Sequence, residues 1–343
     1  MLQSFERVSY LAQTRRLRKM AELAVKEFPL RLVSLDFINH GENATYKVIA
    51  KEGLFLLRLH REGYHSKFAL KEELKWLESL ARYSSLSVQQ PLKSRNGQYL
   101  VQINIPEAPS RFCSVLRWVE GRQRYLNLTP DNFRKTGILT GDLHGVGQKC
   151  KVKYRNYWVA DKLLGKKATL GDYQQFIKFL EKDQKIISGT QSKLLKKMKE
   201  YESSHSKKMG MIHADLHFGN ILWNRGEILP IDFDDCGFGS YLYDIGVTLM
   251  SVNKPFKLMG RKRSQACLEA YFEGYGTRQD LSSLDLKILP YYMLTRELNL
   301  LLWLFERRSN PSVFKHFNWF RKRCLKSIQR AEKGHFSIES LLP

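Results

Sequence analysis

The sequence predicts an α+β fold with two lobes, a small strand-rich N-terminal lobe and a larger, mainly helical C-terminal lobe. The chain of 343 residues is long enough to bury two hydrophobic cores. Residues 32–119 follow a strand pattern that one helix, over about 66–83, interrupts. From residue 242 onward the pattern is mostly helical. We therefore expect one domain over residues 1–119 and a second over residues 120–343.

Further elements follow from apolar spacing and from helix-start signals. Residues 130–146 predict a helix with Thr129 as N-cap, because threonine and a following proline favour a helix start. Residues 149–206 alternate charged and apolar residues and predict two helices. Residues 313–333 predict a cationic amphipathic helix, whose aromatic face we expect on the large lobe rather than on anionic lipid. Residues 1–30 predict a helical lead-in with a stripe of Leu17, Met20, Ala21, Leu23, Ala24 and Phe28.

The strongest functional signal lies in residues 211–235. Asp215 stands two residues after His213, Asn220 follows five residues later, and Asp232 ends the next apolar run. Each residue alone would also suit a turn. A carboxylate can accept the proton of an attacking hydroxyl, and amide and carboxylate oxygens are ligands that Mg²⁺ prefers. The spacing therefore predicts a phosphoryl-transfer site with Asp215 as base and with Asn220 and Asp232 as metal ligands.

The same segment predicts a β-hairpin. Residues 221–223 and 228–231 read as short strands, and residues 224–227 form a turn-favouring cluster between them. Such a hairpin would return the chain so that Asn220 lies near Asp232.

Three neighbouring side chains receive mainly structural interpretations. We expect His213 to pack and to hold the loop by hydrogen bonding. For His217 a position facing phosphate or substrate stays open, but an exposed loop histidine is favoured. Cys236 is expected to be a small packing residue.

At residues 213–220 and 231–235 the chain resembles the aminoglycoside phosphotransferase and choline kinase-like family, which shares the protein-kinase fold. The resemblance implies that Asp215 is the catalytic base and that Asn220 and Asp232 bind Mg²⁺, with ATP as phosphoryl donor. Asp244 then resembles the family's aspartate behind the catalytic loop. We interpret Asp244 as a structural brace, since a carboxylate also suits a helix cap.

The resemblance extends to the N-terminal lobe and implies four ATP-binding residues. Asn43 lies in the turn 41–46, which in relatives covers the phosphates. Arg58 takes the place of the basic residue that contacts the phosphates, and Glu73 would pair with it. Trp118 lies in the strand beside the adenine. Many kinases have lysine where this chain has Arg58; arginine keeps the charge but is larger and is not interchangeable with lysine.

Composition narrows the partners and the location. The net charge of +23 favours a solvated basic surface, with an anionic substrate, nucleic acid or acidic membrane as a weaker alternative. No apolar stretch reaches membrane-spanning length, and the charged N-terminus does not resemble an export signal, so we expect a cytoplasmic protein. Five dispersed cysteines suggest free thiols and no zinc motif: Cys113, Cys150, Cys236, Cys267 and Cys324.

The predicted function is ATP-dependent, Mg²⁺-assisted transfer of the γ-phosphoryl group to a hydroxyl of a small molecule. The chain has no Gly-x-x-x-x-Gly-Lys-Ser/Thr loop, so the phosphates would be held in the manner of protein kinases. A basic chain suits a neutral or anionic alcohol better than a polycationic aminoglycoside. The alternatives are a serine/threonine protein kinase of the same fold, a non-catalytic nucleotide-binding protein of that fold, and a nucleic-acid-associated protein.

Overall fold

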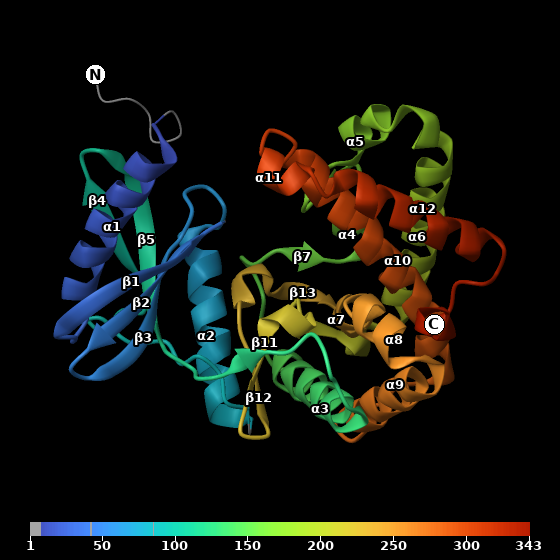
Figure 1. Ribbon diagram of the computed structural model, residues 1–343, viewed down its shortest axis with the longest axis horizontal. Helices are drawn as coiled ribbons and strands as arrows, with labels where there is room; N and C mark the ends of the chain where they lie inside the picture. Colours follow the sequence, from blue (N-terminus) through green and yellow to red (C-terminus); the bar gives the residue numbers. More distant parts are fainter. Residues whose placement is uncertain (1–7, 42, 85) are drawn as a thin grey trace. The chain divides into compact units, whose positions relative to one another are not determined.

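The computed structural model describes residues 8–41, 43–84 and 86–343, without the side chains of residues 253, 254, 311 and 312 (Figure 1). The first seven residues of the predicted lead-in therefore lie outside the described residues, as does Glu42 of the predicted phosphate-covering turn. The chain divides into two compact units. Unit 1 consists of Met1–Glu120 and Lys153–Arg155, and unit 2 consists of Gly121–Val152 and Asn156–Pro343.

Unit 1 is built on a five-stranded antiparallel sheet with the order β1-β2-β3-β5-β4. Its strands are β1 (Leu32–His40), β2 (Ala44–Ala50), β3 (Gly53–Leu59), β4 (Val101–Ile105) and β5 (Ala108–Arg117). Side chains of β2 alternate between buried and partly buried, as period-2 strands with one core face do. The pairing of β2 with β3 runs without a break from Ala44↔Leu59 to Ala50↔Gly53.

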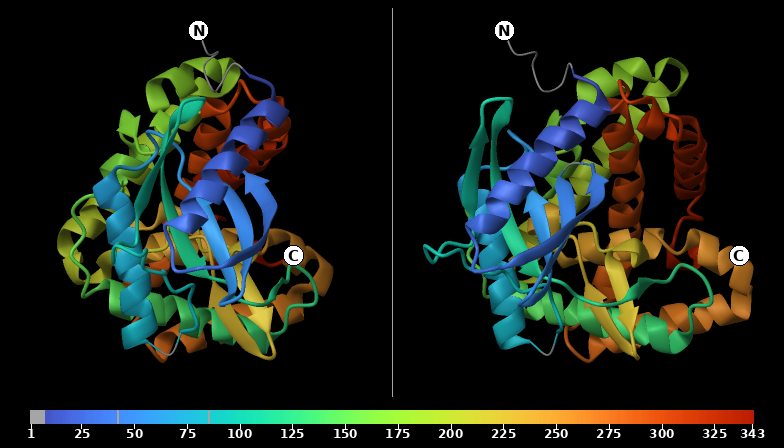
Figure 2. Two further views of the ribbon diagram at one scale, coloured as in Figure 1. Left: turned by 90° about the vertical axis from the view of Figure 1, so that its left-hand side faces the viewer. Right: turned by 60° about the vertical axis from the view of Figure 1, so that its left-hand side comes forward.

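Helix α1 (Tyr10–Lys26) lies across one face of this sheet, as Figure 2 shows. Ser9 caps it by accepting a hydrogen bond from the backbone of Ala12. Its buried side chains join the core formed with the strands. The predicted apolar stripe is confirmed except at Leu23, which is only partly buried. Helix α2 (Lys67–Tyr83) begins after its N-cap Ser66, where the sequence predicts it.

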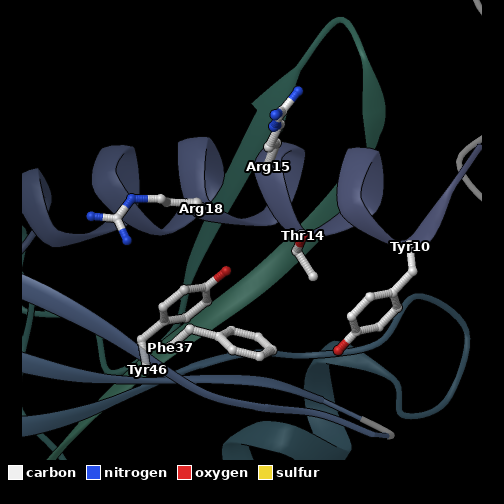
Figure 3. Close-up of a pocket in the computed structure, with 6 residues that line it drawn as sticks. All are labelled: Tyr10, Thr14, Arg15, Arg18, Phe37 and Tyr46. Atoms are coloured by element: carbon white, nitrogen blue, oxygen red, sulfur yellow. The ribbon is translucent and has the colours of Figure 1, made fainter.

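A small hollow of about 320 Å³ lies between α1 and the first two strands (Figure 3). It is lined by Tyr10, Thr14, Arg15, Arg18, Phe37 and Tyr46. Tyr46 is almost fully buried, and this burial raises the pKa of its hydroxyl to about 12. None of the residues predicted for catalysis or nucleotide binding lines the hollow.

Three residues from far along the chain complete unit 1. The carboxylate of Glu72 on α2 accepts hydrogen bonds from the backbone N–H groups of Lys153, Tyr154 and Arg155, at 2.9, 2.8 and 2.9 Å. The ring of Tyr154 stacks on Phe68 with 4.9 Å between centroids. Arg155 is buried, so this segment is an integral part of the unit.

Unit 2 is mainly helical. Its helices are α3 (Pro130–Gly147), α4 (Ala160–Leu164), α5 (Tyr173–Phe179), α6 (Gln184–Ser204), α7 (Tyr241–Met250), α8 (Asn253–Met259), α9 (Arg261–Gly276), α10 (Ser283–Glu306), α11 (Pro311–Phe314) and α12 (Phe317–Glu332). Three small sheets have the orders β10 (Met209–Ile212)-β13 (Gly237–Ser240)-β7 (Tyr157–Trp158), β12 (Glu227–Pro230)-β11 (Ile221–Asn224)-β6 (Arg122–Gln123) and β8 (Lys167–Ala168)-β9 (Gly171–Asp172).

Helix α3 confirms its prediction and packs closely on α9 (Figure 1). Thr129 forms a capping box with Asn132, in which each side chain accepts from the other's backbone. At the crossing, a Cβ atom added to Gly137 would lie 2.0 Å from the carbonyl oxygen of Tyr271. Only glycine allows the two backbones to approach this closely.

Two predictions of helices are wrong in part. Residues 149–206 hold three α-helices and short strands in place of two helices, because Gly165 ends α4 and Gly171, with a positive φ, begins β9 directly after the turn of the β8–β9 pair. The predicted helix 313–333 is broken between α11 and α12. Phe317 of α12 is buried, whereas Trp319, two residues further and therefore on the opposite side of the helix, is 61% exposed.

The predicted α+β class, with a small antiparallel sheet and a larger helical part, is confirmed. Among the described residues, no helix is both long and apolar enough to cross a bilayer. All five cysteines are free thiols, and Cys236 is buried as predicted.

Candidate active site

The predicted hairpin is present and has the expected geometry. Strands β11 and β12 pair from Ile221↔Pro230 to Asn224↔Glu227. The two residues between them, Arg225 and Gly226, both have positive φ, which is typical of a two-residue hairpin turn. Beyond the open end of the pairing, the backbone N–H of Ile231 donates to the carbonyl oxygen of Asn220 at 2.9 Å. Asn220 and Asp232 are thus brought to the same end of the hairpin.

Asp215 lies against this end and contacts three side chains. Its Oδ2 accepts a hydrogen bond from Asn220 Nδ2 at 3.2 Å and lies 3.5 Å from His217 Nε2. Its Oδ1 accepts from Arg296 Nη2 at 2.5 Å. The predicted base is therefore in direct contact with one predicted metal ligand.

Backbone strain marks the segment on both sides of the hairpin. Asp232 has φ 63° and ψ 66°, in the left-handed region, and Ala214 has φ 64°. Left-handed residues other than glycine cost free energy and occur preferentially at functional sites, with aspartate among the better tolerated. Asp232 is exposed at the start of the 3₁₀ turn Phe233–Asp235, so its carboxylate is accessible to a cation.

Asp244 braces the catalytic loop, as predicted. Its two oxygens accept hydrogen bonds from the backbone N–H groups of His213 at 2.8 Å and Ala214 at 2.6 Å. His144 Nε2 lies 3.3 Å from the same carboxylate, which is fully buried. The suggested cap role is wrong, because Ser240 is the N-cap of α7 and Asp244 belongs to the first turn.

The two histidines of this loop, His213 and His217, differ in burial and in how their predicted roles agree with the structure. His213 is buried, shares a hydrogen bond of 3.0 Å between Nε2 and the carbonyl oxygen of Ile231, and packs on Phe233, so its structural role is confirmed. The favoured interpretation of His217 as an exposed loop residue is wrong. His217 is half-buried and its Nδ1 accepts from the backbone N–H of Gly219 at 2.9 Å. Burial lowers the pKa of His217, although the carboxylate of Asp215 opposes the shift.

In unit 1, Arg58 and Glu73 are brought together. Arg58 lies on β3 between Thr45 of β2 and Ser114 of β5, and its guanidinium pairs with the Glu73 carboxylate of α2. Both side chains are buried, so Arg58 is no surface charge at a strand edge. The second oxygen of Glu73 lies 3.7 Å from Arg155 Nη1.

The two other residues predicted for nucleotide binding lie at strand ends. Asn43 Oδ1 accepts from the backbone N–H of Arg61 at 3.1 Å, which ties the β1–β2 turn to the end of β3. Trp118 follows β5, donates its backbone N–H to Leu54 at 3.0 Å, and carries Lys47 Nζ 4.8 Å from its ring centroid.

Sequence reasoning assigned Arg296 no role and no contact with Asp215. Arg296 lies on α10, 81 residues after Asp215, and its side chain is 14% exposed. Burial opposes its charge, but the neighbouring Asp215 and Tyr243 outweigh this and raise the pKa of Arg296. The available signal was its setting: Arg296 is the one basic residue of the mainly apolar stretch 288–305, in which a charged side chain needs a partner.

Comparison with known proteins agrees with this geometry. The family model of the phosphotransferase enzyme family matches residues 35–286. The solved structure of the microcompartment-associated aminopropanol kinase has a TM-score of 0.79 and 28% identity, and covers 94% of this chain and 99% of its own. Amicoumacin kinase of Bacillus subtilis (strain 168) is 24% identical over 270 residues, 76% of this chain and 77% of that protein. The serine/threonine protein kinase RdoA of Salmonella typhimurium is 28% identical over 109 residues, 32% of this chain and 30% of that protein.

Proposed function

Since this chain belongs to the phosphotransferase enzyme family, we propose that it transfers the γ-phosphoryl group of ATP, with Mg²⁺, to a hydroxyl of a small molecule. The observation that carries the proposal is the convergence of Asp215, Asn220 and Asp232 at one end of the β11–β12 hairpin. Phosphoryl transfer needs a base near the nucleophile and positive charge at the phosphates, and these residue types supply both.

In the proposed reaction Asp215 accepts the proton of the acceptor hydroxyl while its oxygen attacks the γ-phosphorus and the bond to ADP breaks. The side-chain amide N–H of Asn220 already donates a hydrogen bond to Asp215, so the amide oxygen of Asn220 is directed toward a different partner. That oxygen and the exposed carboxylate of Asp232 are suitable ligands for Mg²⁺, which neutralises phosphate charge when bound. Among the described residues no three His, Cys, Asp or Glu side chains gather as a metal cage; Mg²⁺ at phosphates needs only one or two protein carboxylates.

We further propose that residues 1–119 form the nucleotide-binding lobe and residues 120–343 the catalytic and substrate-binding lobe. Arg58, held by Glu73, would contact the ATP phosphates, with Asn43 over them and Trp118 beside the adenine. The buried Arg58–Glu73 pair supports this assignment, because two charges are buried together only where their geometry is strictly held. Use of ATP and five free cysteines suit a cytoplasmic enzyme.

The test is a screen for ATP- and Mg²⁺-dependent phosphorylation across small amino, neutral and acidic alcohols, with a serine/threonine peptide library as a separate arm. Phosphorylated product is detected directly, and Asp215→Asn supplies the background. We expect at least one small alcohol to be phosphorylated by the native protein and not by the variant. Product formed only on peptides, or equally by the variant, would contradict the proposal.

A serine/threonine protein kinase is the second candidate, because one relative carries that name. That likeness spans only 32% of this chain, whereas the likeness to the aminopropanol kinase spans 94% of it. The extent of the match therefore favours a small-molecule acceptor.

A further inference from the structure

Arg296 places a positive charge directly against the proposed base. Its Nη2 donates to Asp215 Oδ1 at 2.5 Å, and its side chain is largely buried on α10. The other groups that contact Asp215 are uncharged: the amide of Asn220, and the ring of His217, whose pKa burial lowers. The Tyr243 hydroxyl beside Arg296 is also neutral, since burial raises its pKa. Asp215 and Arg296 therefore form a locally neutral pair.

We propose, resting on the function proposed above, that Arg296 makes this site discriminate against acceptors that carry an ammonium group near the reacting hydroxyl. Acceptors with an anionic group near that hydroxyl, or with no charged group near it, are preferred. The hydroxyl must come within hydrogen-bond distance of Asp215. A substituent one or two carbons from that hydroxyl therefore lies within reach of both charges of the pair.

The reason is electrostatic. An ammonium group beside a lone carboxylate is attracted to it. Here the guanidinium on the same carboxylate cancels that attraction and repels the ammonium. A carboxylate or a neutral polar group on the acceptor instead meets a planar guanidinium, whose several N–H donors suit oxygen acceptors.

A competing role for Arg296 is stabilisation of the phosphoryl group in transfer, as cations do at such sites. The two roles differ in what they change. Contact with the phosphoryl group affects every acceptor equally, whereas an electrostatic filter changes the ratio between acceptors of different charge.

The test uses three acceptors that share a secondary alcohol on three carbons and differ in charge: lactate, 1,2-propanediol and 1-amino-2-propanol. Their binding is measured by ligand-observed NMR on the native protein with Mg²⁺ and a non-hydrolysable ATP analogue, and kcat/KM is measured wherever turnover occurs. Arg296→Gln removes the charge, and Arg296→Lys retains it. The matched control is Arg278→Gln, which breaks another arginine–aspartate pair of unit 2, 2.8 Å from Asp142.

We expect the native protein to bind lactate or 1,2-propanediol more tightly than 1-amino-2-propanol. Arg296→Gln should shift the preference toward 1-amino-2-propanol by about tenfold or more, as removal of a close unit charge requires, while Arg296→Lys and Arg278→Gln keep the native order. Tighter binding of 1-amino-2-propanol by the native protein, an unchanged ratio in Arg296→Gln, or no binding of any of the three would overturn the inference. Because binding is measured without turnover, this outcome is separate from a failure of the phosphorylation screen.

Discussion

At the scale of single residues, Asp215 has the clearest expected effect. Asparagine has nearly the same shape but cannot accept the hydroxyl proton, so Asp215→Asn should lower kcat by about 10² to 10⁴-fold. ATP affinity should change little, because Asp215 contacts Asn220, His217 and Arg296 and is not proposed to bind the nucleotide. Steady-state kinetics and calorimetric titration with ATP analogue measure the two quantities. Retained turnover would remove Asp215 from the role of base.

Substitution of Asp232 should mainly affect Mg²⁺-dependent nucleotide binding, which substitution of Asp215 should leave nearly unchanged. Asp232→Ala removes the proposed carboxylate ligand, so nucleotide binding should lose its dependence on Mg²⁺. The comparison variant is Asp232→Asn, because asparagine tolerates the left-handed backbone of this position and retains an oxygen ligand. A titration of ATP analogue with and without Mg²⁺ should rank the native protein above Asp232→Asn and Asp232→Ala last. Equal Mg²⁺ dependence in all three would refute the assignment.

Which contacts of the candidate site could be predicted depends on how far apart the residues are along the chain. Asp215, Asn220 and Asp232 fall within one hairpin, so local turn chemistry is enough to bring them together. Arg296 reaches Asp215 from a helix 81 residues later, and only the folded packing of α10 determines that contact. The spacing of nearby residues cannot predict a contact between residues so far apart.

At the scale of elements, a buried ion pair between Arg58 and Glu73 joins β3 to α2. Glu73→Ala removes the acid that Arg58 and Arg155 both contact. Breaking a buried ion pair from one side costs roughly 3 to 5 kcal/mol, and denaturant unfolding should show a loss of stability of that size. Glu78→Ala on the same helix removes an exposed glutamate that accepts a hydrogen bond from the Tyr99 hydroxyl, and should cost less than about 1 kcal/mol. Equal losses in the two variants would contradict this account.

Helices α4, α6 and α10 meet at a glutamate that should make stability depend on pH. Glu202 on α6 accepts hydrogen bonds from the backbone of Ala160 and from the Tyr292 hydroxyl, and burial raises its pKa from 4.5 to about 7. The folded state thus favours the protonated acid, so this contribution is complete below pH 4.5 and is lost as the pH rises to about 7.

The measurement is the free energy of unfolding of native protein and Glu202→Gln between about pH 5 and pH 8. Glutamine cannot ionise, so the native protein should lose up to roughly 3 kcal/mol relative to the variant across this range. Parallel profiles would show that Glu202 does not titrate in this way.

Elements were predictable where one local signal dominates. Ser66 before α2 and Thr129 before α3 are strong caps, and both helices begin where the caps stand. Residues 149–206 were not predictable in detail, because β7 pairs in parallel with β13, some 80 residues later, and the β8–β9 pair has only two residues in each strand. Their charge alternation reflects exposure and fits helix and strand equally well.

At the scale of the whole molecule, the net charge of +23 should weaken the folded state through self-repulsion. Potassium chloride raised from about 0.02 to 0.2 M shortens the distance over which charges act, so the unfolding midpoint should rise. Thermal unfolding at constant pH measures it, with sucrose at matched osmolarity as the uncharged comparison. A midpoint that falls with salt would indicate that attractive surface pairs outweigh the repulsion.

The two-lobed plan was predictable because it rests on composition over long stretches, strand-like before residue 119 and helical after residue 242. A composition averaged over a long stretch predicts the fold class correctly even where the prediction of a single helix or strand is wrong. Residues 153–155 could not be assigned in this way, since nothing in a short basic segment indicates that it belongs to unit 1, whose main part ends 33 residues earlier at Glu120.

That segment has a consequence for how the chain can be divided and exchanged. A fragment that ends at residue 120 lacks the three backbone N–H groups that Glu72 binds, and it lacks Arg155 beside Glu73. A recombination event that replaced residues 1–120 by those of a relative would inherit residues 153–155 from the other parent. The hydrogen bonds to Glu72 come from backbone N–H groups, which the segment of either parent supplies, whereas the contact between Arg155 and Glu73 depends on both side chains. Exchange of the N-terminal unit between family members therefore preserves this side-chain contact most securely when residues 153–155 are exchanged with it.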